Sequence, residues 1–310
     1  MTTVIKISLF CVMASTLIAA PALALDTKAQ HAAMANKKLN PVIIAQAIPP
    51  MPKAVGSSKI YYTDSPVIPR QADVTFPYRA IGKLWFTKPD GLAGVCTGSV
   101  IKPGIVLTAG HCVHSGNGKE DGWFKDFKFA PGYRNGPSAR YGIWEGTDNS
   151  WVRTEWYEGG GKMPHRADYA LIVFKANSAG KRIGDLTGVL NYKLSSMIGH
   201  HVTVLGYSNN LDKGKINHRV DSNVATAPNN TGIFGSNMAG GSDGSPVILN
   251  FGTPATGDSL GWAKRNFVVS VVSYGTPASQ MKQGGSEFGN WFESLIIDYA
   301  CKESPEACSK

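Results

Sequence analysis

The chain has 310 residues, 31 of them Lys or Arg and 22 Asp or Glu, which gives a formal net charge of +9 at pH 7. Such a basic balance permits contact with anionic surfaces. The basic residues are dispersed, however, with no run of five or more, so we expect no nucleic-acid partner.

The N-terminus has the pattern of an export signal. Lys6 precedes an apolar run over 7–20, and the small-residue pattern Ala-Leu-Ala follows at 22–24. We predict a signal peptide over 1–24, cleaved after Ala24, and a secreted or periplasmic protein. A buried N-terminal helix is the alternative, which the cleavage pattern disfavours. No run of about 18 apolar residues follows this segment, so we predict no membrane span.

Residues 25–70 are rich in proline and show no strand-like alternation, which predicts a mobile leader or pro-segment that ends near Arg70. The remaining residues, 71–310, form the predicted main domain. Its short β-rich runs are separated by turn residues without βα alternation, so the fold class is all-β, a sandwich or a pair of barrels. The runs lie at 79–86, 98–110, 169–176, 201–208, 245–251 and 266–275. Apolar residues at helical spacing over 287–300 predict a C-terminal helix.

Four cysteines remain after signal removal. In an exported chain they predict two disulfides rather than a metal site, since no CxxC or HxxxH spacing is present. Three pairings are possible, and local spacing favours Cys96 with Cys112 and Cys301 with Cys308. We expect no cofactor and no bound metal.

Three stretches carry candidate chemistry, in the order His, Asp, glycine-rich loop. The first is "LTAGHCV", in which His111 follows a strand-like run. A lone histidine is more often structural, but a disulfide at the neighbouring Cys112 would restrain the imidazole as a general base requires. The second is "RADYALIVF", in which Asp168 precedes an apolar strand. It is either a turn residue or the carboxylate that orients a histidine.

The third stretch is "AGGSDGSPV". Its glycines permit a sharp turn whose backbone amides could converge on an oxyanion. A plain turn is the alternative, although turns rarely combine this density of Gly and Ser with a following Pro and strand.

These motifs, with "FPYRAIGKLWF" near the start of the domain and "VVSYG" near its end, resemble the chymotrypsin-fold (trypsin-like) serine peptidases. Within this family, the sequence is more similar to the bacterial branch that contains the glutamyl endopeptidases. The resemblance covers about 76–295. It implies two six-stranded antiparallel β-barrels with a site in the cleft between them.

The resemblance also implies roles for individual residues. His111 would be the general base and Asp168 its orienting carboxylate, with the oxyanion-hole amides at Gly241 and Asp243. The stretch Ser273, Tyr274 and Gly275 would pair with the substrate backbone as an added strand.

The chain departs from the family at the nucleophile. Counting back from Pro246 places Asp243 where the family has its serine, with Ser242 just before it. A carboxylate there would raise the pKa of His111, and acyl transfer to it would give a mixed anhydride. A shifted loop that presents Ser242 as a substitute nucleophile is the alternative, at a cost in geometry.

The substrate pocket also departs from the family. Alignment places Asn237 and Met238 at its base and Val272 where glutamyl endopeptidases have a histidine, which predicts a neutral pocket. Two hypotheses follow. One is an exported serine endopeptidase of this family, and the other is a catalytically inactive homologue that binds polypeptide. We expect a monomer in either case.

Overall fold

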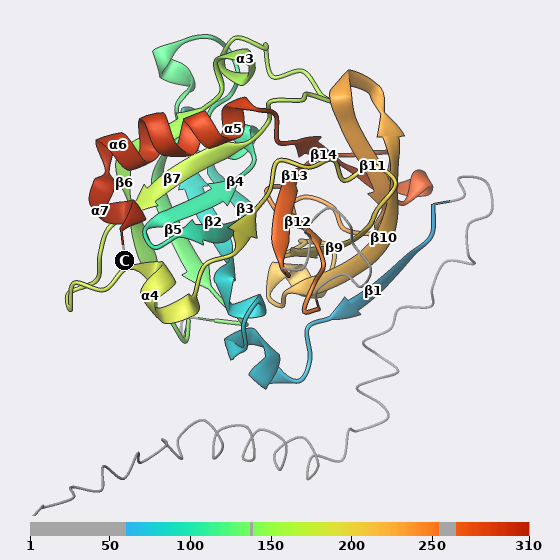
Figure 1. Cartoon of the computed structure of the whole chain (residues 1–310), viewed down its shortest axis with the longest axis horizontal. Coiled ribbons are helices and arrows are strands. Elements are labelled where there is room, and N and C mark those ends of the chain that lie inside the picture. The colour runs from blue at the N-terminus through green and yellow to red at the C-terminus, as the bar shows by residue number, and fades with distance from the viewer. Residues whose placement is uncertain (1–59, 137–138, 254–264, 310) are drawn as a thin grey trace, which may run out of the picture. The chain divides into compact units, whose positions relative to one another are not determined.

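The computed structural model describes residues 60–136, 139–253 and 265–309 (Figure 1). The predicted signal peptide and residues 25–59 of the predicted leader lie outside these ranges. Among the described residues, no helix is both long and apolar enough to cross a membrane.

The first half of the domain is a closed barrel of six antiparallel strands, in the order β2-β3-β4-β7-β6-β5. Its strands are rich in branched and aromatic residues, and β7, "ALIVF", is buried along its whole length. Its bounds are β2 Ile81–Thr87, β3 Ala93–Lys102, β4 Ile105–Thr108, β5 Lys125–Pro131, β6 Trp144–Val152 and β7 Ala170–Phe174.

The second half is also closed by six antiparallel strands, because β9 pairs with both β12 and β10 at the ends of the path β10-β11-β14-β13-β12. Two further strands attach to it: β1 pairs with β10, and β8 pairs in parallel with β13. The bounds are β1 Tyr62–Pro66, β8 Asn191–Tyr192, β9 His201–Gly206, β10 His218–Ala227, β11 Thr231–Gly235, β12 Pro246–Leu249, β13 Phe267–Gly275 and β14 Lys282–Glu287. The predicted pair of six-stranded barrels is therefore confirmed.

Strand β1 corrects one expectation. Residues 62–66 fall in the segment predicted to be a mobile leader, yet they pair in register with β10, from Tyr62 with Ser222 to Pro66 with His218. Five consecutive residues with backbone partners form part of the sheet. The packed domain thus begins before residue 71.

Short helices connect and close the barrels: α3 Thr154–Tyr157, α4 Ile183–Thr187, α5 Trp291–Ser294, a π-helical stretch Leu295–Ala300, α6 Cys301–Glu303 and α7 Pro305–Cys308. The predicted C-terminal helix begins at Trp291 rather than at residue 287, because Glu287 still pairs with Ser270 in the β13–β14 ladder. The helical segment, red in Figure 1, packs on the first barrel, where the Phe292 ring meets Tyr169 edge-on with centroids 5.4 Å apart.

Candidate active site

His111 lies at the end of the first barrel's β4, in a single 3-10 turn over Gly110–Cys112. Cys112 is disulfide-bonded to Cys96 on β3, and Cys301 to Cys308, so both predicted pairings are confirmed. A side chain at Gly110 would place its Cβ 2.9 Å from Asp168 Oδ1, which makes glycine necessary at this close approach. The turn and the disulfide together restrain the imidazole.

Asp168 precedes β7 and its side chain is fully buried. Its Oδ1 accepts a hydrogen bond from the His111 amide at 2.7 Å, and its Oδ2 accepts one from His111 Nδ1 at 2.8 Å. The Ser273 hydroxyl on β13 donates to Oδ2 at 2.5 Å. Three donors hold this buried carboxylate, so Nδ1 carries the proton and Nε2 is directed away from Asp168.

The glycine-rich loop is held between the barrels by its backbone. The Thr97 amide donates to the Asp243 carbonyl, and the Gly244 amide donates to the Val272 carbonyl, both at 2.8 Å. Gly244 has φ +82°, and a Cβ there would lie 2.2 Å from Thr108 Oγ1. The loop therefore keeps a tight turn that only glycine fits at this position.

The Asp243 carboxylate faces the histidine, with 3.7 Å between its Oδ1 and His111 Nε2. The backbone amides of Gly241 and Asp243, predicted as oxyanion donors, act on this carboxylate in the direction that lowers its pKa. Burial raises the pKa of Asp243, while the imidazolium and the two amides oppose that rise. The side chain at the predicted nucleophile position is thus a carboxylate that faces His111.

His111 lies between two carboxylates. Burial favours the neutral imidazole, but the charge and hydrogen bond of Asp168, with the charge of Asp243, outweigh it and raise the pKa of His111 to about 9. The ring is therefore protonated at neutral pH, and in that state it accepts no proton from a nucleophile.

The structure does not bring Ser242 to His111. The Ser242 side chain is buried; its hydroxyl donates to the Ala239 carbonyl at 2.6 Å and accepts a hydrogen bond from Gln283 Nε2 at 2.8 Å. Sequence reasoning did not identify Gln283, because it lies 41 residues away on β14 and no local pattern links the two.

A cavity of about 600 Å³ opens beside Asp243, and its lining includes Asn237, Met238 and Gly275. Val272 is fully buried outside this lining. Two residues predicted to bind substrate have side chains engaged elsewhere. Ser273 bonds Asp168, and the Tyr274 hydroxyl lies 3.0 Å from Thr231 Oγ1. These side chains are therefore engaged, and the predicted backbone contact with a substrate stays a prediction.

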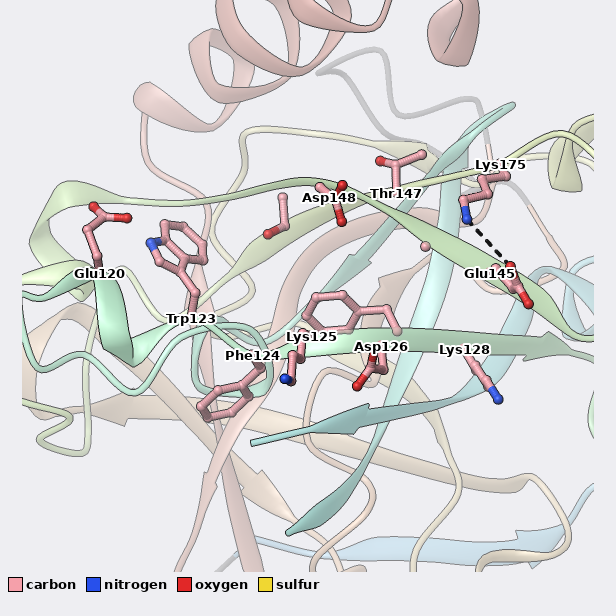
Figure 2. A pocket seen from close by; sticks show the side chains of 13 residues that line it. Glu120, Trp123, Phe124, Lys125, Asp126, Lys128, Glu145, Thr147, Asp148 and Lys175 are labelled. Atoms are coloured by element: carbon pink, nitrogen blue, oxygen red, sulfur yellow. Dashed lines mark hydrogen bonds and ion pairs between the residues drawn. The ribbon is translucent and has the colours of Figure 1, made fainter. Parts of the chain in front are cut away.

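A second cleft, of about 610 Å³, lies in the first barrel where β5 and β6 diverge beyond their pairing of Lys128 with Glu145. Figure 2 shows lysine and acidic side chains mixed along it, with an ion pair of 3.5 Å between Lys175 and Glu145. Its lining includes neither His111 nor Asp243, and its mixed charges favour no one kind of ligand.

Two β-barrels with a histidine–aspartate pair and a glycine-rich loop between them define the chymotrypsin-like class. The family model described as a trypsin-like peptidase domain matches residues 96–253, just over half of the chain, and the chain belongs to this family.

The chain is also similar to two curated proteins and to solved structures. The chain is 29% identical to the glutamyl endopeptidase of Bacillus licheniformis over 175 residues, which cover 56% of this chain and 49% of that protein. It is 43% identical to the extracellular metalloprotease of Bacillus subtilis over 74 residues, 24% of this chain and 22% of that one. The matches thus span about half or less of these curated relatives. Among solved structures, protease Anisep from Arthrobacter nicotinovorans superposes with a TM-score of 0.59 at 27% identity, covering 72% of this chain and 96% of that chain.

Proposed function

We propose that this protein is an exported member of the trypsin-like family that binds polypeptide in the cleft beside Asp243 without hydrolysing it. The observation that carries the proposal is the carboxylate of Asp243 at the nucleophile position, which lies 3.7 Å from His111 Nε2.

This arrangement blocks each step of acyl transfer. A carboxylate that attacked a peptide carbonyl would form a high-energy mixed anhydride. A protonated His111 cannot serve as general base, and the Asp243 carboxylate places a negative charge beside the amides predicted to bind a developing oxyanion. Ser242 does not replace the missing nucleophile, since its hydroxyl is hydrogen-bonded to Ala239 and Gln283.

The parts that hold a polypeptide are retained. The backbone of Ser273–Gly275 follows the last contact between β13 and the glycine-rich loop, at Val272, and it leads into the lining of the 600 Å³ cavity. An extended ligand would add there as a strand, with one side chain in the cavity. Export by a signal peptide over 1–24 agrees with two disulfides, which persist in oxidising compartments.

Binding and hydrolysis of casein test the proposal together. Fluorescently labelled casein fragments should give saturable anisotropy changes with the full chain, and casein should remain intact over the same period. The Asp243→Ser variant should retain binding and gain hydrolysis. Turnover of casein by the parent chain that is lost in Ser242→Ala would contradict the proposal.

A further inference from the structure

His111 and Asp243 face each other at a distance that is too long for a hydrogen bond. His111 Nε2 lies 3.7 Å from Asp243 Oδ1, whereas a charged N–H group and a carboxylate bond at about 2.7–2.9 Å. Two ligand atoms that share a zinc ion lie roughly 3.4 Å apart, because each sits about 2.0–2.2 Å from the metal at a tetrahedral angle. The observed separation is therefore closer to that of two ligands of one cation.

Both side chains can be reached from solvent. The His111 side chain is 28% exposed and that of Asp243 is 24% exposed. The histidine belongs to the turn after β4 and the aspartate to the loop before β12. Rotation of the exposed carboxylate about its side-chain bonds closes the remaining few tenths of an ångström, so a cation can enter between the two groups while the backbone stays in place.

Asp168 prepares the histidine as a ligand. Its Oδ2 accepts the His111 Nδ1 hydrogen bond at 2.8 Å and is itself held by the Ser273 hydroxyl at 2.5 Å. A histidine that binds a metal almost always donates its other ring N–H to such an acceptor, which fixes the ring and raises its basicity. The nitrogen left over, Nε2, is the one that faces Asp243.

The charges around the ring favour a cation. Asp168 and Asp243 both act on His111 in the direction that favours positive charge, while Lys88 opposes them. A divalent ion places twice the charge of an imidazolium between the same two carboxylates. The Nε2 proton leaves to solvent when the metal binds, as metal ligation of a histidine requires.

The other histidine between two carboxylates, His218, shows the opposite arrangement. Its Nδ1 lies 3.2 Å from Asp64 Oδ1 and its Nε2 lies 2.8 Å from Asp212 Oδ2. Both ring nitrogens are thus hydrogen-bonded, and the ring is only 3% exposed. No gap for an ion separates His218 from either partner, so a long, accessible nitrogen–carboxylate separation distinguishes His111.

We infer that His111 Nε2 and the Asp243 carboxylate form a binding site for a divalent transition-metal ion such as Zn²⁺, with Asp168 as the carboxylate that orients the histidine ligand. Imidazole and carboxylate are common zinc ligands, and two of them leave at least two positions of a tetrahedral shell for water. The aspartate at the family's serine position thus supplies a metal ligand. Cysteine and histidine spacing did not predict this site, because its two ligands lie in different barrels.

Titration with Zn²⁺ alone tests the inference. The full chain is stripped of metal with a chelator, dialysed, and titrated at pH 8 in an isothermal calorimeter. We expect one ion per chain with a dissociation constant below about 100 μM. Asp243→Asn, which replaces the carboxylate by an amide of the same shape, and His111→Ala should each weaken binding at least about tenfold, since even the groups that orient a ligand contribute that much.

His201→Ala is the matched control, because His201 is an exposed histidine at the start of β9 in the second barrel. It should bind Zn²⁺ as the parent does. X-ray absorption of the zinc-loaded parent should show one imidazole with oxygen ligands and no sulfur. This spectrum reports the ligands directly and does not depend on the stability of any variant.

Each outcome bears on the site by itself, because no polypeptide is present. Parent binding weaker than about 100 μM overturns the inference. Binding by Asp243→Asn or His111→Ala within threefold of the parent also overturns it, as does a loss confined to His201→Ala. A metal-free result leaves the proposed function standing, and failure of casein to bind leaves the metal site standing.

Discussion

The two barrels contribute to the site in different ways. The first supplies His111 and Asp168 in the hydrogen-bonded arrangement of a peptidase, fixed by a disulfide and a buried carboxylate. The second supplies a glycine-rich loop whose backbone keeps a tight turn, while the side chain at its centre is the carboxylate of Asp243. The shape of the glycine-rich loop is thus set by glycines and backbone hydrogen bonds, and it is kept with an aspartate at its centre.

The largest expected loss of stability comes from a substitution that disrupts the turn of the glycine-rich loop. Gly244→Ala forces a side chain into φ +82° and against Thr108 Oγ1 at 2.2 Å. The strain and the clash together should lower the free energy of unfolding by about 4 kcal/mol. Urea denaturation followed by circular dichroism measures it.

Gly240→Ala in the same loop is the matched control. A Cβ there meets no atom within 4 Å and the backbone is not in the left-handed region. Its effect should stay within about 0.5 kcal/mol. Equal losses in the two variants would contradict the account of the turn.

A smaller loss is expected in the first barrel. Asp168→Asn leaves three donors, from the His111 amide, the His111 ring and Ser273, facing a group that can no longer accept from all of them. Unfolding free energy should fall by about 3 kcal/mol. Asp243→Asn, at a carboxylate that is 24% exposed, should change it by less than about 1 kcal/mol. A larger loss in Asp243→Asn than in Asp168→Asn would reverse the comparison.

The subtlest effect is on proton binding. The pKa of His111 in the fold, about 9, lies above its ordinary value of 6.5, so the protonated ring stabilises the fold fully below pH 6.5 and loses that contribution as the pH rises through 9. In Asp243→Asn, NMR titration should show the pKa of His111 lower by about one pH unit. An unchanged pKa would show that Asp243 does not act on the ring.

Much of the site was predictable because its chemistry is local. "TAGHC" and "GGSDGSP" place His111 and Asp243 in short motifs, and cysteine spacing favoured both disulfides. Strands β10 and β14 were not among the predicted runs, because "HRVDSNVATA" and "KQGGSE" are polar or glycine-rich and owe their strand form to neighbours in the sheet.

Long-range contacts could not be predicted. The proline-rich surroundings of β1 predicted a leader, and only pairing with β10 reveals a strand there. The bonds from Ser273 to Asp168 and from Asn237 to Asp64 join residues 105 and 173 positions apart, and no local pattern marks either.

Reaction with a fluorophosphonate tests the central claim most directly, because the reagent labels only a serine that a neighbouring base has activated. The parent chain and Asp243→Ser are treated side by side, and the adduct is located by mass spectrometry. The account predicts no adduct on the parent and one adduct at position 243 of the variant. An adduct on Ser242 of the parent, abolished by Ser242→Ala, would contradict it.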